Sequence, residues 1–567
     1  VGGGPAGSTV GSLLRKYNPS LTVAILEKER FPREHVGESQ LPAVGAVLHE
    51  MGVWDDIEAC NFVVKLGATY TWGKSQEPWV FSFIPRDDIL DTPRPAPFEG
   101  WRKRVALQVD RARYDDILLK HSAKLGCEVF EETGVTKVLR DGDTILGLVS
   151  SSEKTFKGRY YIDASGNIGV LRRAMGVPID SPTILQNVAF WDYWKKQGLN
   201  VELLEEKAIR VQVRSVPFGW LWYIALSDDE TSVGLVCPSS YFKDCGKDAE
   251  TLYKEAIQLE PLISRLLTDA AATGDVRATK DWSFLSDRAY GDNWFLCGES
   301  VGFADPILAA GMTLTHSCAQ HCAYTILELE RGEHDASWLR EQYNEIQRKR
   351  IQQHMKFADY WYSANGCFTD LQEHCSEIAG NSGLKLSPEE AFRWLSNGAI
   401  DDNVGQVGFG GFNLAGVKQV QHRLSHDVSG KVVYRIDGRN VFKLRTEGAT
   451  EKVIARVEAG EVRPVRALER DGDVLVLAGA YLLVYDILLK VKKVTDFLSL
   501  LKAEIKLRGT PGEEVFLYRA AMQCLESMAA RGWVKTSTDP KLPLLRMDTP
   551  EEGEYIFSAT GDGISLG

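Results

Sequence analysis

The chain opens with a glycine-rich stretch, Gly2-Gly3-Gly4-Pro5-Ala6-Gly7-Ser8, in which Gly2, Gly4 and Gly7 fit the spacing G-x-G-x-x-G. In such a turn the first glycine permits a tight bend, the second lets the backbone approach a pyrophosphate, and the third allows a helix to pack closely on a strand. The amides at the start of that helix then face the anion. The stretch therefore predicts a phosphate-binding turn that opens a helix.

The residues after this turn strengthen the prediction. Residues 8–15 have a helical pattern, and residues 22–26 form an apolar run typical of a buried parallel strand that ends at Glu27. A carboxylate about 20 residues after the glycines is where a ribose hydroxyl is bound. We therefore expect an adenine dinucleotide site that includes Glu27 and Lys28. A solvated carboxylate at a strand end is the alternative for Glu27, and the strand that usually precedes the turn would lie before Val1.

Composition limits the class of protein. A chain of 567 residues is too long for one ordinary core, so we expect two or three domains. The net charge of -12 argues against nonspecific binding to nucleic acid or to an anionic membrane, and no apolar run reaches the length of a membrane span. The ten cysteines are scattered without a C-x-x-C pair, which favours reduced thiols in a cytoplasmic protein.

One segment collects His316, Cys318, His321 and Cys322, which are potential metal ligands. The same segment has the pattern of a buried helix, in which cysteine is a common small core residue. We therefore favour a structural role for these side chains over a metal site.

The order of patterns divides the chain into four parts. We expect an α/β nucleotide-binding domain of Rossmann type over 1–178, an inserted antiparallel sheet over 179–290 that would form the wall of a substrate chamber, a return to the first domain over 291–365, and a C-terminal domain over 366–567. The C-terminal part reads as a small α/β appendage, for which a winged helix is one option. It lacks a basic recognition face, so a packing or partner-docking role is favoured over DNA binding.

Individual elements follow from periodicity and from turn residues. Helices are predicted over 8–15, 41–51, 111–125, 249–270, 312–331 and 336–364, with further helices within 484–534. Strands are predicted over 22–26, 61–72, 188–194, 208–213, 219–226, 232–236, 432–436, 441–443, 453–457 and 474–477.

Four separated elements indicate one extended dinucleotide. They are the glycine turn, the strand end at Glu27, the turn at Asp163, and the block from Gly298 to Met312, and the polar loop 31–39 should lie beside them. The candidate cofactor-binding residues are Gly2, Gly4, Pro5, Ala6, Gly7, Ser8, Glu27, Lys28, Arg33, Ser39, Arg111, Asp163, Gly298, Asp305, Pro306, Gly311 and Met312. Arg33 and Arg111 would bind phosphate or ribose, although Arg111 could instead cap its helix pair.

On these motifs, residues 1–365 resemble the FAD-dependent halogenases, which are built like para-hydroxybenzoate hydroxylase. The resemblance rests on Phe31-Pro-Arg33, Val36-Gly-Glu-Ser39, Lys65-Leu-Gly67, a tryptophan pair, and Phe303-Ala-Asp-Pro306. Within the family the chain is most similar to the chloramphenicol-biosynthesis branch, which also has a long C-terminal extension.

The tryptophan pair matches the family signature W-x-W-x-I-P as Trp220, Trp222 and Ile224, with Ala225 in place of the proline. In the family this segment keeps the substrate away from the flavin, so the resemblance implies a substrate gate. The alternative is an ordinary core strand. Ala309 is a second departure, because many phenol and pyrrole halogenases have serine there, which weakens any transfer of their substrate preference.

The resemblance implies catalytic roles for Lys65 and Glu38. The family lysine directs hypohalous acid to the substrate, by a hydrogen bond or as a chloramine, which suits a buried amine with a lowered pKa. The alternative is a lysine that snorkels to solvent. Glu38 would position the oxidant or act as a general base, and its alternative is a carboxylate at a helix N-terminus.

The resemblance also implies a halide site and a cofactor linkage. The amides of Gly311 and Met312, at a helix start, would hold chloride. Related enzymes hold FAD covalently through an aspartate, for which Asp281 is the candidate here, an ion pair in a strand turn being its alternative.

The implied reaction uses reduced FAD, O2 and chloride to form hypochlorous acid, which Lys65 relays to a small activated acyl substrate, free or bound to a carrier protein. A separate flavin reductase would supply the reduced flavin, and neither nucleic acid nor a membrane is an expected partner. Tyr360, Trp361 and Tyr362 would line the chamber or, as we favour, pack the C-terminal domain. The competing function is an FAD-dependent monooxygenase, hydroxylase or reductase of the same fold, and a non-enzymatic role is a third reading.

Overall fold

A computed structural model describes residues 1–73, 76–84, 89, 93–203, 208–280, 283–381, 434–508, 514–547, 555–557 and 564–566. The chain forms two compact units. The first contains Val1–Pro78, Pro85–Ser382 and Val457–Arg463, and the second contains Trp79–Ile84, Gly383–Arg456 and Pro464–Gly567. The predicted α/β class is confirmed for both units. Within the described residues, no helix is both long and apolar enough to cross a bilayer.

A parallel sheet carries the glycine turn at the start of the chain. Strand β1 (Ala24–Leu26) pairs in parallel with β5 (Glu128–Phe130), and β9 (Tyr161–Asp163) pairs in parallel with β18 (Trp294–Leu296). The first two residues join these pairs, because Val1 N donates to Ile162 O at 2.7 Å and Gly2 N donates to Leu26 O at 2.8 Å. The predicted Rossmann-type sheet is therefore present, with the turn directly at its edge.

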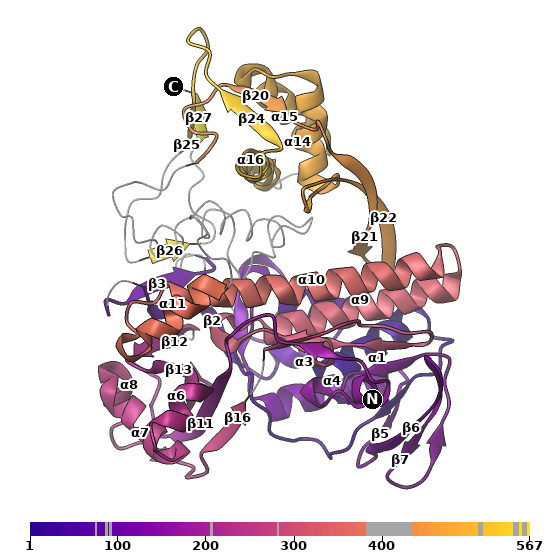
Figure 1. Ribbon diagram of the computed structural model, residues 1–567, viewed down its shortest axis with the longest axis vertical. Helices are drawn as coiled ribbons and strands as arrows, with labels where there is room; N and C mark the ends of the chain where they lie inside the picture. Colours follow the sequence, from indigo (N-terminus) through magenta and orange to yellow (C-terminus); the bar gives the residue numbers. More distant parts are fainter. Residues whose placement is uncertain are drawn as a thin grey trace. The chain divides into compact units, whose positions relative to one another are not determined.

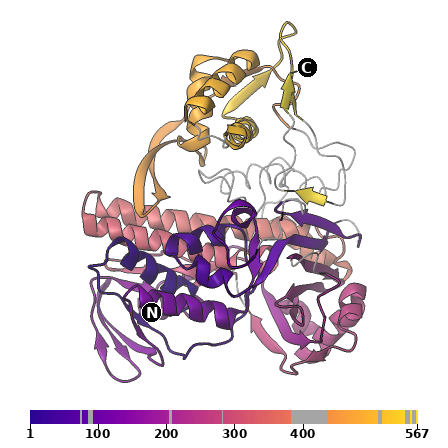
Figure 2. The same ribbon diagram turned by 180° about the vertical axis from the view of Figure 1, so that it is seen from behind.

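Helices cover this sheet. Helix α1 (Pro5–Tyr17) contacts both α4 (Arg111–Lys124) and α9 (Gly311–Arg331), and α9 lies along α10 (Ala336–Ser363), as Figures 1 and 2 both show. His316 of α9 joins the first three, since its Nδ1 is 2.9 Å from Thr9 Oγ1 and its Nε2 is 2.8 Å from Tyr114 Oη. The shorter helices α2 (Ala43–Met51), α3 (Trp54–Glu58) and α5 (Val170–Ala174) complete this half.

A second, larger sheet forms the other half of the first unit (Figure 1). Its strand order is β15-β11-β14-β13-β12-β2, with β16 also paired to β11 and β4 to β2. The bounds are β2 Val63–Thr71, β4 Ala106–Gln108, β11 Asn187–Lys195, β12 Ala208–Val216, β13 Gly219–Ala225, β14 Glu230–Pro238, β15 Ala271–Ala272 and β16 Arg277–Lys280. Within the predicted insertion, strands β11 to β16 pair antiparallel, as predicted, whereas β2 from the N-terminal part joins the sheet in parallel with β12, with a bulge at Ile209/Arg210. The sheet extends beyond the predicted insertion, since β2 and β4 come from the N-terminal part.

One predicted helix of this half is wrong. The pattern over 249–270 suggested a single helix, but the chain forms α7 (Ala249–Leu259) and α8 (Pro261–Leu266). Pro261 has no backbone N–H group to continue the hydrogen bonding of α7. The carboxylate of Glu260 accepts a hydrogen bond from Ile263 N at 2.6 Å and so caps the start of a new helix. Together with α6 (Ser239–Asp244), these helices pack on one face of the sheet around residues such as Leu221 and Tyr223.

Smaller elements connect these parts. They are the sheet of β6 (Val135–Asp141), β7 (Thr144–Ser150) and β8 (Thr155–Phe156), the sheet of β10 (Ile179–Asp180), β17 (Phe284–Ser286) and β19 (Gly302–Phe303), the helix α11 (Gln372–Asn381), and the 3-10 turns η2 (Gly100–Arg104), η3 (Gly166–Ile168), η4 (Gly298–Ser300), η5 (Pro306–Leu308) and η6 (Thr369–Leu371).

The second unit has its own hydrophobic core around Phe442, Leu501 and Trp533. Its elements are β3 Trp79–Ser82, β20 Val441–Leu444, β21 Thr450–Glu458, β22 Glu461–Arg470, β23 Asp473–Val476, α14 Gly479–Lys490, α15 Val494–Arg508, α16 Glu514–Ala530, β24 Val534–Ser537, β25 Leu545–Met547, β26 Tyr555–Phe557 and β27 Ile564–Leu566. The strand predicted over 432–436 is wrong for its described part, 434–436, and β22 was not predicted. The α/β appendage is confirmed, and its winged-helix version stays a prediction.

Candidate active site

The glycine turn is too tightly packed for side chains. Gly2 has φ +102°, and a Cβ on it would lie 2.2 Å from Ala164 O. A Cβ on Gly7 would lie 1.9 Å from the carbonyl oxygen of Gly2. Gly4 is the N-cap of α1 and Pro5 opens the helix, while Ser8 Oγ donates to Gly3 O at 2.8 Å. The turn therefore keeps the helix start close to the sheet, as a phosphate cradle requires.

Glu27 closes this turn from the end of β1. Its buried carboxylate accepts hydrogen bonds from Gly3 N at 2.7 Å and from Glu29 N at 2.9 Å. The solvated alternative for Glu27 is therefore wrong. Lys28 points elsewhere, since its exposed amine pairs with Glu29 at 3.0 Å, so the structure does not bring it to the turn.

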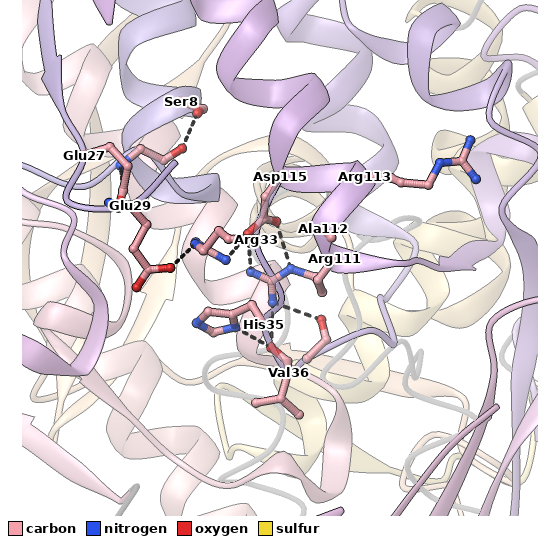
Figure 3. Close-up of polar contacts among 12 residues, drawn as sticks. Ser8, Glu27, Glu29, Arg33, His35, Val36, Arg111, Ala112, Arg113 and Asp115 are labelled. Carbon is pink, nitrogen blue, oxygen red and sulfur yellow. Dashed lines mark hydrogen bonds and ion pairs between the residues drawn. The ribbon is translucent and has the colours of Figure 1, made fainter. Parts of the chain in front are cut away.

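Arg33 and Arg111 meet on one carboxylate (Figure 3). Arg33 Nη1 lies 3.1 Å from Asp115 Oδ2, while Arg111 Nε lies 2.9 Å from Asp115 Oδ1. Burial opposes the ionisation of Asp115, but the nearby positive charges, Arg111 first and Arg33 after it, together hold the pKa of this carboxyl below its usual range. A Cβ on Gly4 would lie 3.2 Å from Arg33 Nη2, so Arg33 stands beside the turn.

Arg111 does not cap its own helix. Asp110 is the N-cap of α4 and accepts from Ala112 N at 2.9 Å, whereas Arg111 Nη1 donates to Val36 O at 2.8 Å. Arg111 thus joins α4 to the polar loop 31–39.

The other two predicted cofactor segments converge on the same turn. Cys297 N, just before Gly298, donates to Asp163 O at 2.8 Å, and a Cβ on Gly298 would lie 3.2 Å from Ala6 Cβ. The carboxylate of Asp163 is already used, because it accepts from Leu171 N at 2.7 Å and from Arg172 N at 2.9 Å. The side chain of Asp163 therefore stabilises the turn that follows β9, by binding the backbone of Leu171 and Arg172.

A row of buried polar atoms without partners continues from the polar loop. Among the described residues, Glu38 Oε2, Ser39 Oγ, Gln40 Nε2 and both amide atoms of Gln108 make no hydrogen bond, and Ser39 faces Gln108 across a β-bridge. Such atoms are costly to bury unless a ligand or water satisfies them. The phosphate cradle at one end and these polar groups further along fit an extended dinucleotide such as FAD. Gln40 and Gln108 were missed by the sequence analysis, as was Glu299, whose pKa is raised by burial.

Lys65 is the third residue of β2 and is only 2% exposed. Its Nζ donates to Gln40 O at 2.9 Å, and burial lowers the pKa of the amine to about 7. The alternative in which Lys65 snorkels to solvent is therefore wrong. At neutral pH a large share of the amine is uncharged, so it can act as a nucleophile or as a hydrogen-bond donor.

Glu38 is 1% exposed and lies two residues before the carbonyl that receives Lys65. Tyr193 Oη donates to Glu38 Oε1 at 2.8 Å. Burial raises the pKa of Glu38 to about 7, an effect that the hydrogen bond from Tyr193 partly offsets. The next helix, α2, has Pro42 as its N-cap without a side-chain cap, so the alternative of a helix-capping carboxylate is wrong for Glu38. Tyr193 was not predicted.

Gly311 and Met312 form the start of the 21-residue helix α9, as predicted. A cavity at this end of α9 is lined by residues of the block from Gly298 to Met312, which we call the flavin block, among them Gly298, Phe303 and Gly311, and by Thr315 of α9. A helix start next to a cavity can hold an anion.

The tryptophan pair is tied to the flavin block by a buried polar network. Trp220 Nε1 donates to Tyr362 Oη at 2.7 Å, and Tyr362 Oη donates to Asp305 Oδ1 at 3.2 Å. Asn187 Nδ2 donates to Asp305 Oδ2 at 3.0 Å, and burial raises the pKa of Asp305 to about 7. Next to Asp305, Pro306 opens the turn η5. Tyr362 thus belongs to the buried network of the site region. Its ring centroid also lies 6.0 Å from that of Phe368 in the predicted C-terminal part, so the favoured packing assignment stays a prediction.

Trp222 is held separately. Its Nε1 donates to Ser232 Oγ at 3.1 Å, and its ring lies so close to Gly234 that a Cβ there would be 2.2 Å from it. Both indoles are therefore fixed by hydrogen bonds and packing on one strand, with ring centroids 6.2 Å apart.

The histidines of α9 have ordinary partners. His316 bonds to Thr9 and Tyr114, and His321 Nδ1 lies 2.7 Å from Gln347 Nε2. The predicted buried helix is confirmed, and in the described part of the chain no three histidine, cysteine or acidic side chains are grouped to hold a metal. Asp281, the candidate for a covalent link, lies outside the described residues.

Comparison with known proteins agrees with this geometry. The profile of the tryptophan halogenase family matches residues 1–94 and 95–370. The tryptophan 2-halogenase of Chondromyces crocatus is 28% identical, over 75% of this chain and 80% of that protein. The 1H-pyrrole-2-carbonyl-(peptidyl-carrier protein) chlorinase of Pseudomonas fluorescens is also 28% identical, over 65% of this chain and 84% of that protein.

Two solved structures are similar over most of their length. CmlS, a flavin-dependent halogenase, is 25% identical with a TM-score of 0.69, covering 95% of each chain. CndH, the myxobacterial chondrochloren halogenase described as a variant of FAD-dependent halogenases, is 28% identical with a TM-score of 0.57, covering 75% of this chain and 95% of its own.

Proposed function

Because the chain belongs to the tryptophan halogenase family and is an FAD-dependent halogenase, we propose that it chlorinates an activated carbon of a small acyl substrate, with Lys65 delivering the chlorine. The observation that carries this proposal is the burial of Lys65 in β2, with its amine held at Gln40 O and its pKa lowered to about 7. Burying a lysine costs folding free energy, and strongly shifted pKa values of this kind are typical of residues that react or bind a ligand.

The residues of the glycine turn, with Glu27, Arg33 and Arg111, would hold the pyrophosphate and ribose of FAD, and Ser39, Gln40 and Gln108 would contact its more distal part. When bound and reduced, FAD would activate O2, which is the oxidant that converts chloride to hypochlorous acid. Gly311 and Met312 would hold the chloride at the start of α9.

Asp281 remains our candidate for a covalent link to FAD. If all of the flavin separates from the denatured wild-type protein, the link is overturned. If the denatured wild-type protein retains flavin and Asp281→Asn does not, the link is supported.

Lys65 would act on hypochlorous acid as a neutral amine. Its nitrogen attacks chlorine, an N–Cl bond forms as the O–Cl bond breaks, and water leaves. The carbon nucleophile then takes the chlorine, and the nitrogen regains a proton. This chloramine route is the first of two versions of the step. In the second version no N–Cl bond forms, and the amine only donates a hydrogen bond that orients hypochlorous acid. The two versions differ in pH dependence, because the first needs the uncharged amine, whose fraction rises as the pH passes about 7.

Glu38 would serve as the general base for the carbon acid, and its pKa of about 7 suits transfer near neutral pH. Trp220 and Trp222 would exclude the organic substrate from the flavin, because their indoles are fixed by hydrogen bonds to Tyr362 and Ser232.

Relatives support two substrate classes. One relative is named for a pyrrole acyl group on a peptidyl-carrier protein, which supports a carrier-bound acyl substrate. Another is named for tryptophan, which makes tryptophan the main competitor. Enzymes of this kind require a separate flavin reductase, and we propose that one supplies this protein. The remaining alternative is a monooxygenase, which would need neither Lys65 nor a halide.

The test supplies FADH2, O2 and chloride or bromide with a panel of 3-oxoacyl thioesters, a carrier-bound pyrrole acyl group and tryptophan, and follows product mass. We expect halide-dependent addition of chlorine, lost in Lys65→Met and kept in Lys137→Met, which alters an exposed lysine of β6. A gain of oxygen that is independent of halide, or full chlorination by Lys65→Met, would contradict the proposal.

A further inference from the structure

The carboxyl group of Glu38 is held unequally at its two oxygens. Oε1 accepts the hydrogen bond from Tyr193, whereas Oε2 is buried and makes no hydrogen bond among the described residues. The backbone on either side is fixed, because Val109 N donates to Glu38 O at 2.8 Å and Gln40 N donates to Leu107 O at 3.1 Å. One oxygen is thus anchored by Tyr193. The other makes no hydrogen bond of normal length within the described part of the chain, although the hydroxyl of Ser232 also faces this carboxyl group, so it can accept a proton or a hydrogen bond from a bound ligand.

Tyr193 is itself held in place. It lies on β11 of the large sheet, and the guanidinium of Arg277, from the neighbouring strand β16, lies 5.2 Å from the centroid of its ring. Arg277 Nη2 in turn pairs with Glu34 Oε2 at 2.5 Å. Since Glu34 and Glu38 belong to the same loop, Arg277 and Tyr193 join this loop to the sheet at two points.

We propose that Tyr193 is a positioning residue for Glu38, which fixes Oε1 so that Oε2 faces the proton that Glu38 transfers. This inference rests on the proposed function, which gives Glu38 its role. Arg277 supports it by holding the ring of Tyr193 against the loop. The groups that face Glu38 are Tyr193 from β11, Arg111 from α4 and the hydroxyl of Ser232 from β14.

The contact predicts the direction in which a Tyr193→Phe substitution acts. A hydrogen bond to a carboxylate stabilises its charged form, so its loss raises the pKa of Glu38 above the value of about 7. A charge-assisted hydrogen bond corresponds to a shift of about one pH unit. The limb of the pH–rate profile that belongs to Glu38 should move upward by the same amount, with the KM for chloride unchanged.

The experiment titrates the protonated carboxyl band of the full chain loaded with oxidised FAD, by infrared difference spectroscopy. The band of Glu38 is the one that Glu38→Gln removes. Tyr193→Phe should move its midpoint upward by about one pH unit, and Arg277→Gln should move it in the same direction by less. The control is Tyr223→Phe, which removes a buried hydroxyl of the same sheet that donates to Asn200 Oδ1 at 2.7 Å and should leave the midpoint unchanged.

The outcomes separate the two claims. An unshifted midpoint in Tyr193→Phe, or the same shift in Tyr223→Phe, overturns the positioning role. If Tyr193→Phe does not fold, an unshifted midpoint in Arg277→Gln has the same meaning. The catalytic role of Glu38 in the proposed function is tested separately, by the turnover of Glu38→Gln. Full turnover by that variant would overturn the catalytic role.

Discussion

At the scale of single residues, burial explains the chemistry of the candidate site. Lys65 and Glu38 are both shifted toward a pKa of about 7, from opposite sides, because burial disfavours the charged form of each. Two groups that titrate near neutral pH in one region suit proton and chlorine transfer. Each shift also affects folding, because the unfolded chain returns both groups to water.

The shift of Lys65 predicts how stability depends on pH. Between about pH 7 and the ordinary value of 10.5, the unfolded chain binds more protons at this lysine than the folded one, so the free energy of unfolding rises with pH. Lys65→Met should remove this contribution and stabilise the fold at pH 7 by on the order of 2 kcal/mol, since the lost hydrogen bond offsets part of the gain. Urea unfolding of wild type and Lys65→Met at pH 7 and 9.5 measures both the pH dependence and the stabilisation. A variant less stable than wild type at pH 7 would contradict the burial argument.

Glu38 predicts the opposite slope. Between 4.5 and about 7 the folded chain holds a proton at Glu38 that the unfolded chain has lost, so this residue makes stability fall as the pH rises. Glu38→Gln should flatten that part of the curve and leave the slope above pH 8 unchanged. Unfolding at pH 5 and 7 measures the change, and an unaltered slope would mean that Glu38 titrates normally.

At the scale of elements, local patterns predicted what depends on neighbours in sequence. Helix α4 was predicted over 111–125 and occupies Arg111–Lys124, where Asp110 caps it by accepting from Ala112 N at 2.9 Å, and the glycine turn was predicted from its spacing. Pairings between distant strands were not predictable in this way. The parallel pairing of β2 with β12 places Lys65 in the large sheet, and no periodicity within either strand encodes it. Tyr193 was missed for the same reason, because 155 residues separate it from Glu38.

The glycine turn predicts a graded response to alanine. In Gly7→Ala the new methyl would lie 1.9 Å from Gly2 O, so the turn must move, and we expect a loss of about 1–3 kcal/mol in stability with weaker FAD binding. Gly4→Ala is the comparison, because its Cβ would meet only the flexible end of Arg33 at 3.2 Å. Its stability should stay close to that of wild type. Denaturant unfolding and fluorescence titration with FAD measure the two effects, and equal losses of stability would contradict the packing described here.

At the scale of the whole molecule, chemistry and accessory structure separate. Every candidate site residue that the structure describes lies in the first unit. The second unit has a core of its own and contributes none of these residues. Its role in packing or partner docking stays a prediction. Since a ligand stabilises the structure that binds it, FAD should act on the first unit alone.

This separation predicts two thermal transitions in the full chain. FAD at about 100 times its dissociation constant should stabilise the first unit by about 2.7 kcal/mol and raise one transition only. Leu501→Ala, in the core of the second unit, should lower the other one, because removing a buried leucine side chain costs about 2–5 kcal/mol. Calorimetry with and without FAD, on wild type and variant, tests this assignment. A single transition that FAD raises and Leu501→Ala lowers would instead mean that the two cores unfold as one, and that the second unit contributes to cofactor binding through stability.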